Sequence, residues 1–195
     1  MPDAPSDRTA DTSVPVHPAI AARWSPRAFD PTAELGKEDL VGVLEAARWA
    51  PTWGRRQPVR FLVGRRADEV FTTLAGLLRR GNSYATVASA LVLVCVDDGE
   101  DDRTARYAAV DAGAALANLS VEAVSRGLIV HPMAGFDTEG ARSAFGLSEQ
   151  LRPLVVIAVG RLGDYADVAP EIAERDGQPR QRAPLEDVVL NWAQF

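Results

Sequence analysis

Apolar and small residues recur at the spacing of one helix face in several stretches of the chain. The clearest stretch is 35–50, and Pro51 should end this helix because proline disfavours helical backbone in the residue before it. Its apolar face carries Leu40, Val43, Leu44, Ala47 and Ala50. The same spacing predicts further helices over 16–24, 67–81, 104–127 and 138–146.

Short runs rich in valine and leucine lie between these helices and predict strands. They span residues 59–64, 90–96, 128–136 and 153–163. The run 90–96, ALVLVCV, is apolar at every position, which is typical of a strand buried on both faces. Helices and strands follow one another without strict alternation, so the chain is expected to form an α+β or α/β layered domain with helices packed on a central sheet.

Length and composition favour one domain. The chain has 195 residues and 47% of them are hydrophobic, which is enough for one substantial core. Residues 1–14 are polar and proline-rich, so they are expected to form a flexible tail before a single domain over 15–195. The sequence has no membrane-length apolar run and no secretory signal pattern, so we expect a cytoplasmic protein without a membrane partner.

Several function classes are disfavoured by what the sequence contains. The formal net charge of −6 argues against a nucleic-acid partner, because phosphate neutralisation needs a broad basic face. The single cysteine, Cys95, lies in the apolar run and is read as a small buried side chain. The two histidines have no paired cysteine or histidine beside them, so no metal site is expected. Glycine-rich dinucleotide and phosphate loops and a G-x-S-x-G motif are missing as well.

Arginine is concentrated in three separated places of this acidic chain. RWSPRAFD carries Arg23, Ser25 and Arg27, and the polar C-terminal region carries Arg180 and Arg182. Between Ala46 and Ala67 there is no acid, and this stretch holds Arg48, Arg55, Arg56, Arg60, Arg65 and Arg66. Arginine suits phosphate because its planar fork donates two parallel charge-assisted hydrogen bonds. The clusters therefore predict a shared phosphate site; the alternative is that each arginine is a solvated surface group paired with nearby acids.

Four segments together resemble the nitroreductase family of FMN-dependent oxidoreductases. They are RWSPRAFDP, ARWAPTWGRRQPVRFLV, DAGAALANLSVEAVSRGLIVHPMAGFD, and LRPLVVIAVGRLG with RQRAPLEDVV, and the resemblance runs from about Pro18 to Val189. It implies an α+β fold with a central mixed sheet flanked by helices, and a homodimer that holds FMN in a groove between the subunits while the C-terminal segment is exchanged. It also implies a ping-pong cycle, in which NAD(P)H delivers hydride to flavin N5 and a small-molecule electron acceptor then collects the electrons.

The resemblance also implies roles for individual residues. Arg23, Arg180 and Arg182 should bind the FMN phosphate, and Ser25 a polar atom of the cofactor. Arg27 should face the pyrimidine edge, where a fixed cation favours the reduced flavin. The P-x-x-G-F-D pattern of PMAGFD brings the backbone of Ala134 and Gly135 toward flavin N5. The full expected cofactor-binding set is Arg23, Trp24, Ser25, Arg27, Pro51, Thr52, Arg55, Gln57, Asn82, Pro132, Ala134, Gly135, Arg180 and Arg182.

The loop that begins at Pro51 departs from the family pattern in two places. Arg55 stands where the family usually has asparagine, and Val59 stands where it usually has tryptophan. In the family this loop reaches the FMN bound mainly by the other subunit. We expect Arg55 to add a further arm on the phosphate, since no acid lies near it in sequence. Trp53 and Tyr84 are expected to line the substrate mouth or, alternatively, to be packed aromatics.

No side chain needs to act as an acid or base in hydride transfer, so no catalytic residue is expected beyond the flavin itself. The function that the resemblance implies is transfer of hydride from NADH or NADPH to a nitroaromatic, a quinone or a similar acceptor. Three alternatives remain at this point: a flavin-binding or flavin-storing protein with little turnover, an arginine-lined site for another phosphorylated ligand, and an interaction module without a cofactor.

Overall fold

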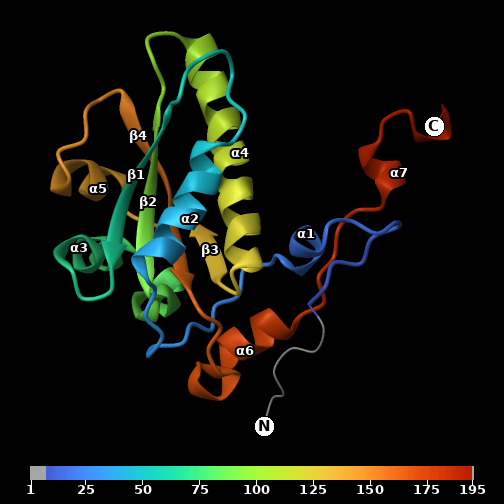
Figure 1. Cartoon of the computed structure of the whole chain (residues 1–195), viewed down its shortest axis with the longest axis horizontal. Coiled ribbons are helices and arrows are strands. Elements are labelled where there is room, and N and C mark those ends of the chain that lie inside the picture. Colours follow the sequence, from blue (N-terminus) through green and yellow to red (C-terminus); the bar gives the residue numbers. More distant parts are fainter. Residues whose placement is uncertain (1–7, 195) are drawn as a thin grey trace.

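A computed structural model describes residues 8–194, so residues 1–7 of the expected tail and Phe195 lie outside the described part. The described helices and strands follow the predicted order as far as residue 160, but two short helices after it were not predicted (Figure 1). The strands are β1 (Val59–Arg65), β2 (Ala90–Asp97), β3 (Ile129–Met133) and β4 (Leu151–Gly160). The α-helices are α1 (Pro18–Ala22), α2 (Lys37–Arg48), α3 (Glu69–Leu77), α4 (Asp102–Ser125), α5 (Thr138–Ala144), α6 (Pro170–Gly177) and α7 (Leu185–Val188). Three 3-10 segments are η1 (Arg80–Val87), η2 (Tyr165–Asp167) and η3 (Trp192–Gln194).

The four strands form one sheet in the order β1-β2-β4-β3, and the fold is α+β as expected. Among the described strands all three pairings are antiparallel, which differs from the expected mixed sheet. The connection between β1 and β2 shows why, since it leaves at Arg65 and returns at Ala90, and these two residues pair with each other. A chain that re-enters the sheet at the end where it left must run antiparallel to its neighbour.

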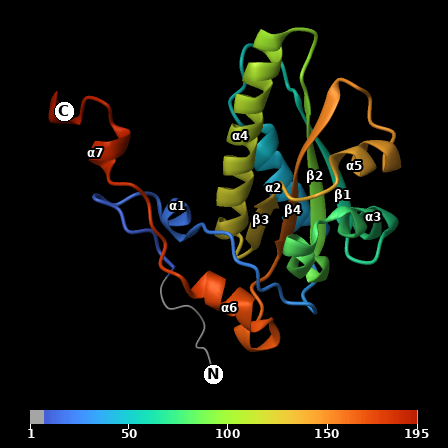
Figure 2. The ribbon, with the colours of Figure 1, turned by 180° about the vertical axis from the view of Figure 1, so that it is seen from behind.

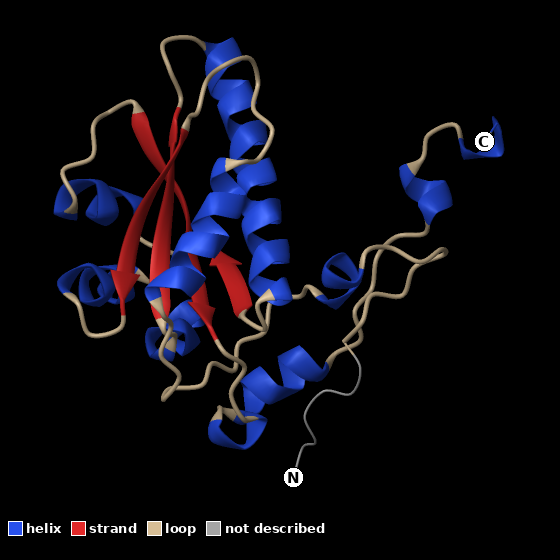
Figure 3. Ribbon diagram, in the orientation of Figure 1, coloured by secondary structure: helices blue, strands red, loops and turns tan. Residues whose placement is uncertain are grey.

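Helices cover both faces of the sheet (Figures 1 and 3). On one face α2 and α4 bury a cluster that includes Val43, Leu119 and Ile157. On the other face α3, η1 and α5 bury Leu74, Phe136 and their neighbours. The central strand β2 is buried from Ala90 to Val96, as its uninterrupted apolar run predicts.

Aspartates cap the N-termini of three helices, α3, α4 and α5. Asp68, Asp101 and Asp137 each accept a hydrogen bond from a backbone N–H of the first turn, at 2.7–2.9 Å. The helix predicted over 67–81 is shorter in the structure, because α3 ends at Leu77 and the chain continues as η1. This early end places Asn82 and Tyr84 on a 3-10 segment rather than on α3.

The N-terminal and C-terminal segments of the described chain lie side by side and extend away from the sheet (Figures 1 and 2). Residues 8–14 form neither helix nor strand, but the N–H of Ala10 donates to the carbonyl of Ala21 at 2.9 Å. From α6 onward the chain passes beside α1 and extends to α7 and η3. None of the helices within residues 8–194 is both long and apolar enough to cross a bilayer.

Candidate functional site

One small cavity gathers arginines from distant parts of the chain. Its volume is about 210 Å³. It is lined by Arg8, Arg23, Trp24, Ser25, Arg27, Arg175, Asp176, Arg180 and Arg182. The R-x-S-x-R segment that follows α1 and the basic pair that follows α6 therefore meet at one place, which we call the arginine cavity. The arginines of these two segments are therefore not separate surface groups that are each surrounded by solvent.

The arginine cavity carries much more positive than negative charge, because six arginines line it and Asp176 is the only acid among its lining residues. Burial lowers the pKa of Arg180, and the nearby charges of Arg23, Arg8 and Arg182 lower it further. Like charges that crowd in this way repel one another. An anion with several oxygens would relieve that repulsion.

Asp176 is buried, with 1% of its surface exposed, and it holds Arg27. Its Oδ2 accepts from the backbone N–H of Arg27 at 2.6 Å, and its Oδ1 pairs with Nη1 of the same residue at 2.5 Å. The hydroxyl of Tyr165 donates to Oδ2 at 2.8 Å. Burial, together with this carboxylate, raises the pKa of Tyr165, so the phenol stays protonated. The last turn of α6 thus fixes the R-x-S-x-R segment in place.

Arg180 and Arg182 differ in what they already bind. The guanidinium of Arg180 donates to the carbonyls of Ala21 at 3.0 Å and Arg23 at 2.9 Å, and also to that of Arg8. Arg182 is exposed and donates to the adjacent carbonyl of Gln181 at 2.8 Å. Arg180 therefore shapes the wall of the arginine cavity, whereas Arg182 keeps most of its donors for a ligand.

A series of contacts leads from the arginine cavity to the PMAGFD loop. The guanidinium carbon of Arg27 lies 5.8 Å from the ring centroid of Tyr84, whose hydroxyl donates to Oδ1 of Asn82 at 3.4 Å. Nδ2 of Asn82 donates to the carbonyl of Gly135 at 2.8 Å. Burial raises the pKa of Tyr84 to about 12, so its hydroxyl remains a donor. Asn82 and Gly135, which were predicted independently, are thus in direct contact.

Gly135 is required by this contact. A Cβ at this position would lie 2.7 Å from Nδ2 of Asn82, closer than side-chain carbons approach such an atom. Pro132 lies before it on β3, and Ala134 is exposed. His131 on the same strand is buried, and its Nδ1 lies 3.0 Å from the carbonyl of Pro26, which ties β3 to the R-x-S-x-R segment.

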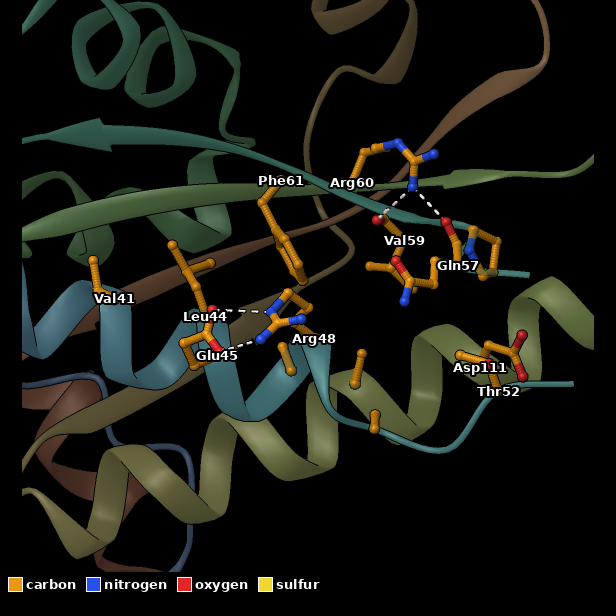
Figure 4. Close-up of a pocket in the computed structure, with 14 residues that line it drawn as sticks. Val41, Leu44, Glu45, Arg48, Thr52, Gln57, Val59, Arg60, Phe61 and Asp111 are labelled. Atoms are coloured by element: carbon orange, nitrogen blue, oxygen red, sulfur yellow. Dashed lines mark hydrogen bonds and ion pairs between the residues drawn. The ribbon is translucent and has the colours of Figure 1, made fainter. Parts of the chain in front are cut away.

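The loop after α2 lies in a different part of the protomer. Thr52 and Gln57 line a cavity of about 420 Å³ between α2, β1 and α4 (Figure 4). Asp111 of α4 fixes this loop by accepting from the backbone N–H of Trp53 at 2.8 Å. The two cavities share no lining residue. A single described chain therefore does not bring Pro51, Thr52, Arg55 and Gln57 to the arginine cavity.

Most of the arginines between Ala46 and Ala67 have partners within the described chain, either an acid outside this stretch or a backbone carbonyl. Arg48 pairs with Glu45 at 2.6 Å, and Arg56 with Asp97 at 3.3 Å. Arg60, Arg65 and Arg66 donate to backbone carbonyls. Arg55 is exposed and forms no ion pair within residues 8–194. The lack of acids nearby in sequence was therefore a poor guide for the stretch as a whole.

The two residues expected at a substrate mouth lie apart. Trp53 is stacked on Tyr107 of α4, with ring centroids 4.9 Å apart and an interplanar angle of 12°, and the guanidinium carbon of Arg103 lies 5.3 Å from its ring centroid. Tyr84 lines a separate cavity of about 240 Å³ beside the arginine cavity. Within the described chain, Trp53 is therefore a packed aromatic, whereas Tyr84 lines a cavity at a different site.

Three residues of the arginine cavity were not anticipated from the sequence: Arg8, Arg175 and Asp176. Arg8 falls in the stretch expected to be a flexible tail, and the other two precede the predicted basic pair by a few residues. RDGQPRQR does present them together in the sequence, so a search for charged residues flanking the basic pair would have included them.

The fold is α+β, with helices on both faces of one sheet, and it carries a cavity lined by six arginines and one aspartate. The model of the nitroreductase family matches residues 20–91 and 77–161 of the chain. These matches cover more than half of the chain, and this protein therefore belongs to the nitroreductase family.

Individual relatives agree with this assignment. An uncharacterised 15.4 kDa protein of Mycolicibacterium smegmatis is 64% identical over 140 residues, which cover 68% of this chain and 95% of that protein. YdgI of Bacillus subtilis (strain 168), a candidate NAD(P)H nitroreductase, is 24% identical over 89% of this chain and 95% of its own. A crystal structure described as an oxidoreductase containing FMN superposes with a TM-score of 0.87, at 31% identity, over 95% of this chain and 96% of that one.

Proposed function

We propose that this protein is an FMN-dependent oxidoreductase that moves electrons from NADH or NADPH to a nitroaromatic, a quinone or a similar small acceptor. One observation carries the proposal: Arg23, Ser25, Arg27, Arg180 and Arg182, which were chosen from the sequence for an FMN site, line one cavity. The similar crystal structure described as containing FMN, and the candidate NAD(P)H nitroreductase of Bacillus subtilis, support the choice of cofactor and reductant.

The residues present fit an FMN phosphate. The arginine cavity has the volume of a small polar group and an excess of guanidinium donors over acids. Arg182 and Arg23 would hold the phosphate, while Arg180 keeps the backbone around them in shape through its bonds to the carbonyls of Ala21 and Arg23. When bound, FMN would supply the hydride-accepting and hydride-donating chemistry that no side chain provides.

The contacts from Arg27 to Gly135 would position the ring system. Arg27 lies between the arginine cavity and Tyr84, so its guanidinium would meet the polar edge of the ring. Asn82 uses one donor on the carbonyl of Gly135 and keeps the second N–H of its amide for the ring. Gly135 leaves the loop without a side chain at this point. Arg27 is paired with Asp176, which partly neutralises its charge. Arg27 would therefore stabilise a reduced flavin less than an unpaired arginine would.

A homodimer would complete the site. The loop of Thr52 and Gln57 does not reach the arginine cavity of its own chain, so it would serve the cofactor of the partner. The arm from residue 184 to 194 extends away from the sheet and exposes Leu185, Val188, Leu190 and Trp192 (Figure 2). Apolar side chains on such an arm are expected to bury themselves on another subunit. Val41 and Trp49 of the α2 region and Val110 of α4 are exposed apolar positions suited to such a contact.

NAD(P)H and the acceptor would use the same site in turn, in a ping-pong cycle. An anaerobic absorbance titration tests the whole proposal. The purified protein is expected to be yellow, to bleach on addition of NADPH or NADH, and to regain its colour when a quinone or nitroaromatic is added. A yellow protein that neither nucleotide bleaches would instead be a flavin-binding protein without turnover. A colourless protein that takes up no added FMN would refute both functions.

Removing residues 184–194 tests the dimer separately. The full chain is expected to elute as a dimer in size-exclusion chromatography with light scattering, and the shortened chain as a monomer with weaker FMN binding. A shortened chain that remains dimeric and binds FMN as tightly as the full chain would show that the arm is not exchanged.

A further inference from the structure

Arg8, on the segment that precedes α1, lines the arginine cavity together with the residues of the R-x-S-x-R segment. We infer that Arg8 is an additional phosphate-binding arginine, so that residues 8–16 form part of the cofactor site rather than a tail. This inference rests on the proposed function for the identity of the ligand. Three features of the Arg8 side chain support the inference: its position in the cavity, the contacts that hold it in place, and a donor without a partner.

The side chain of Arg8 is held in place from two sides. Its guanidinium carbon lies 4.6 Å from the ring centroid of Trp24, and its Nη1 donates to the carbonyl of Gln178 at 2.7 Å. Its own carbonyl accepts a hydrogen bond from Arg180. Arg8 is therefore locked between the R-x-S-x-R segment and the chain that leads to the basic pair. An arginine that is already ordered loses little side-chain entropy when it meets a ligand.

Arg8 nevertheless keeps an unused donor. Its Nε is buried and has no hydrogen-bond partner within the described residues. A buried N–H without an acceptor costs free energy, and the same side chain lines the arginine cavity, where a phosphate oxygen would supply a partner for its guanidinium. No carboxylate lies within ion-pair distance of Arg8 in residues 8–194, whereas Arg27 in the same cavity is paired with Asp176.

A bound anion would also stabilise the charge of Arg8. Arg8 acts on Arg180 as a like charge, in the same sense as Arg23 and Arg182. A positive charge that repels its neighbours is unfavourable by itself and becomes favourable beside a doubly charged phosphate. Binding of the phosphate should therefore hold residues 8–16 against the rest of the cavity.

Substitution of Arg8 by methionine tests the role of its charge, since methionine keeps an unbranched apolar stem over Trp24. Dissociation constants for FMN, riboflavin and inorganic phosphate are measured by calorimetry on flavin-free protein. Arg8→Met is expected to weaken FMN and phosphate binding about tenfold and to leave riboflavin binding within about twofold. Arg8→Lys should recover part of the loss. Arg80→Met is the matched control, because Arg80 is exposed and lies outside the arginine cavity.

Equal losses for FMN and riboflavin, or no loss for either, would overturn the assignment of Arg8. A wild-type protein that binds no flavin would refute the proposed function, and the inorganic phosphate titrations would still decide the role of Arg8. Modification of the wild-type protein with phenylglyoxal gives a test without a variant. Bound phosphate or FMN, but not riboflavin, should slow modification of Arg8 relative to Arg80, and equal rates would contradict the inference.

Discussion

Asp176 holds the backbone and the side chain of Arg27 at the same time. Its two carboxylate oxygens lie 2.6 Å from the backbone nitrogen of Arg27 and 2.5 Å from its Nη1. The two residues are 149 positions apart in the sequence. The geometry of the R-x-S-x-R segment therefore depends on a carboxylate from the other end of the described chain, and removing that carboxylate should disturb both the fold and the site.

Asp176→Asn is expected to lower the free energy of unfolding by about 3 kcal/mol, because it leaves Arg27 without its buried counter-charge. Urea unfolding followed by circular dichroism measures this loss. Glu174→Gln on the same helix is the control, since Glu174 is exposed and its variant should unfold like the wild type. If both variants unfold at the same urea concentration, the pair contributes no net stability.

The two members of the C-terminal basic pair should respond differently to substitution. Arg182→Met is expected to weaken FMN binding about tenfold with no change in melting temperature, because Arg182 is exposed. Arg180→Met should weaken FMN binding and also lower the melting temperature, since the carbonyls of Ala21 and Arg23 lose their donor. Flavin fluorescence titration and differential scanning calorimetry of both variants test the contrast. Identical behaviour of the two variants would contradict it.

Gly135→Ala is expected to push the amide of Asn82 out of place, because the new Cβ would lie 2.7 Å from Nδ2. The cost should be about 1–2 kcal/mol of unfolding free energy, as for other overpacked sites. Gly81→Ala is the control, since no atom lies within 4 Å of a Cβ there. In an Asn82→Ala background the cost of Gly135→Ala should shrink, and full additivity of the two substitutions would show that the residues do not interact.

His131 should make the fold sensitive to mild acid. Burial lowers the pKa of His131, so the folded protein binds fewer protons at this site than the unfolded chain. This contribution to stability is complete above the unfolded histidine pKa of about 6.5 and is lost as the pH falls below it.

Urea unfolding at about pH 7.5 and about pH 5 measures the effect of His131. His131→Asn can still donate to the carbonyl of Pro26 but does not titrate, so its stability should fall less over this interval. His17→Asn keeps His131 and should show the full wild-type dependence. An unchanged dependence in His131→Asn would mean that other groups cause the acid sensitivity.

Periodicity and local composition were sufficient to predict the order of the helices and strands from α1 to β4, but they did not predict α6 and α7. β2 and α2 gave clear signals, because an apolar run of seven residues and apolar residues at regular helical spacing have few competing structures. The end of α3 was less accurate, since Leu78 and Arg79 continue a helical pattern while the chain turns into η1. Strand direction was not encoded locally, and the sheet proved antiparallel where a mixed one was expected.

Candidate site residues were found from the sequence where a motif named them, and missed where only the folded chain brings them together. Arg23, Arg27 and Arg182 belong to short patterns and do line one cavity. Asp176 looks like one more charge in a polar region, yet it is buried. Arg48 and Arg56 looked unpaired in the sequence but form ion pairs in the structure. Arg48 pairs with Glu45, which lies just before the acid-free stretch, and Arg56 pairs with Asp97, which lies far along the chain.

The arginine cavity takes its walls from residues 8–27 and from residues 175–182. Both the sheet and the first of these walls precede the second wall in the chain, so the arginine cavity is completed only by the last part of the described chain. If the proposed cofactor binds here, its uptake would be a late event in synthesis, and a chain that ends before Arg182 would lack part of one wall of the site.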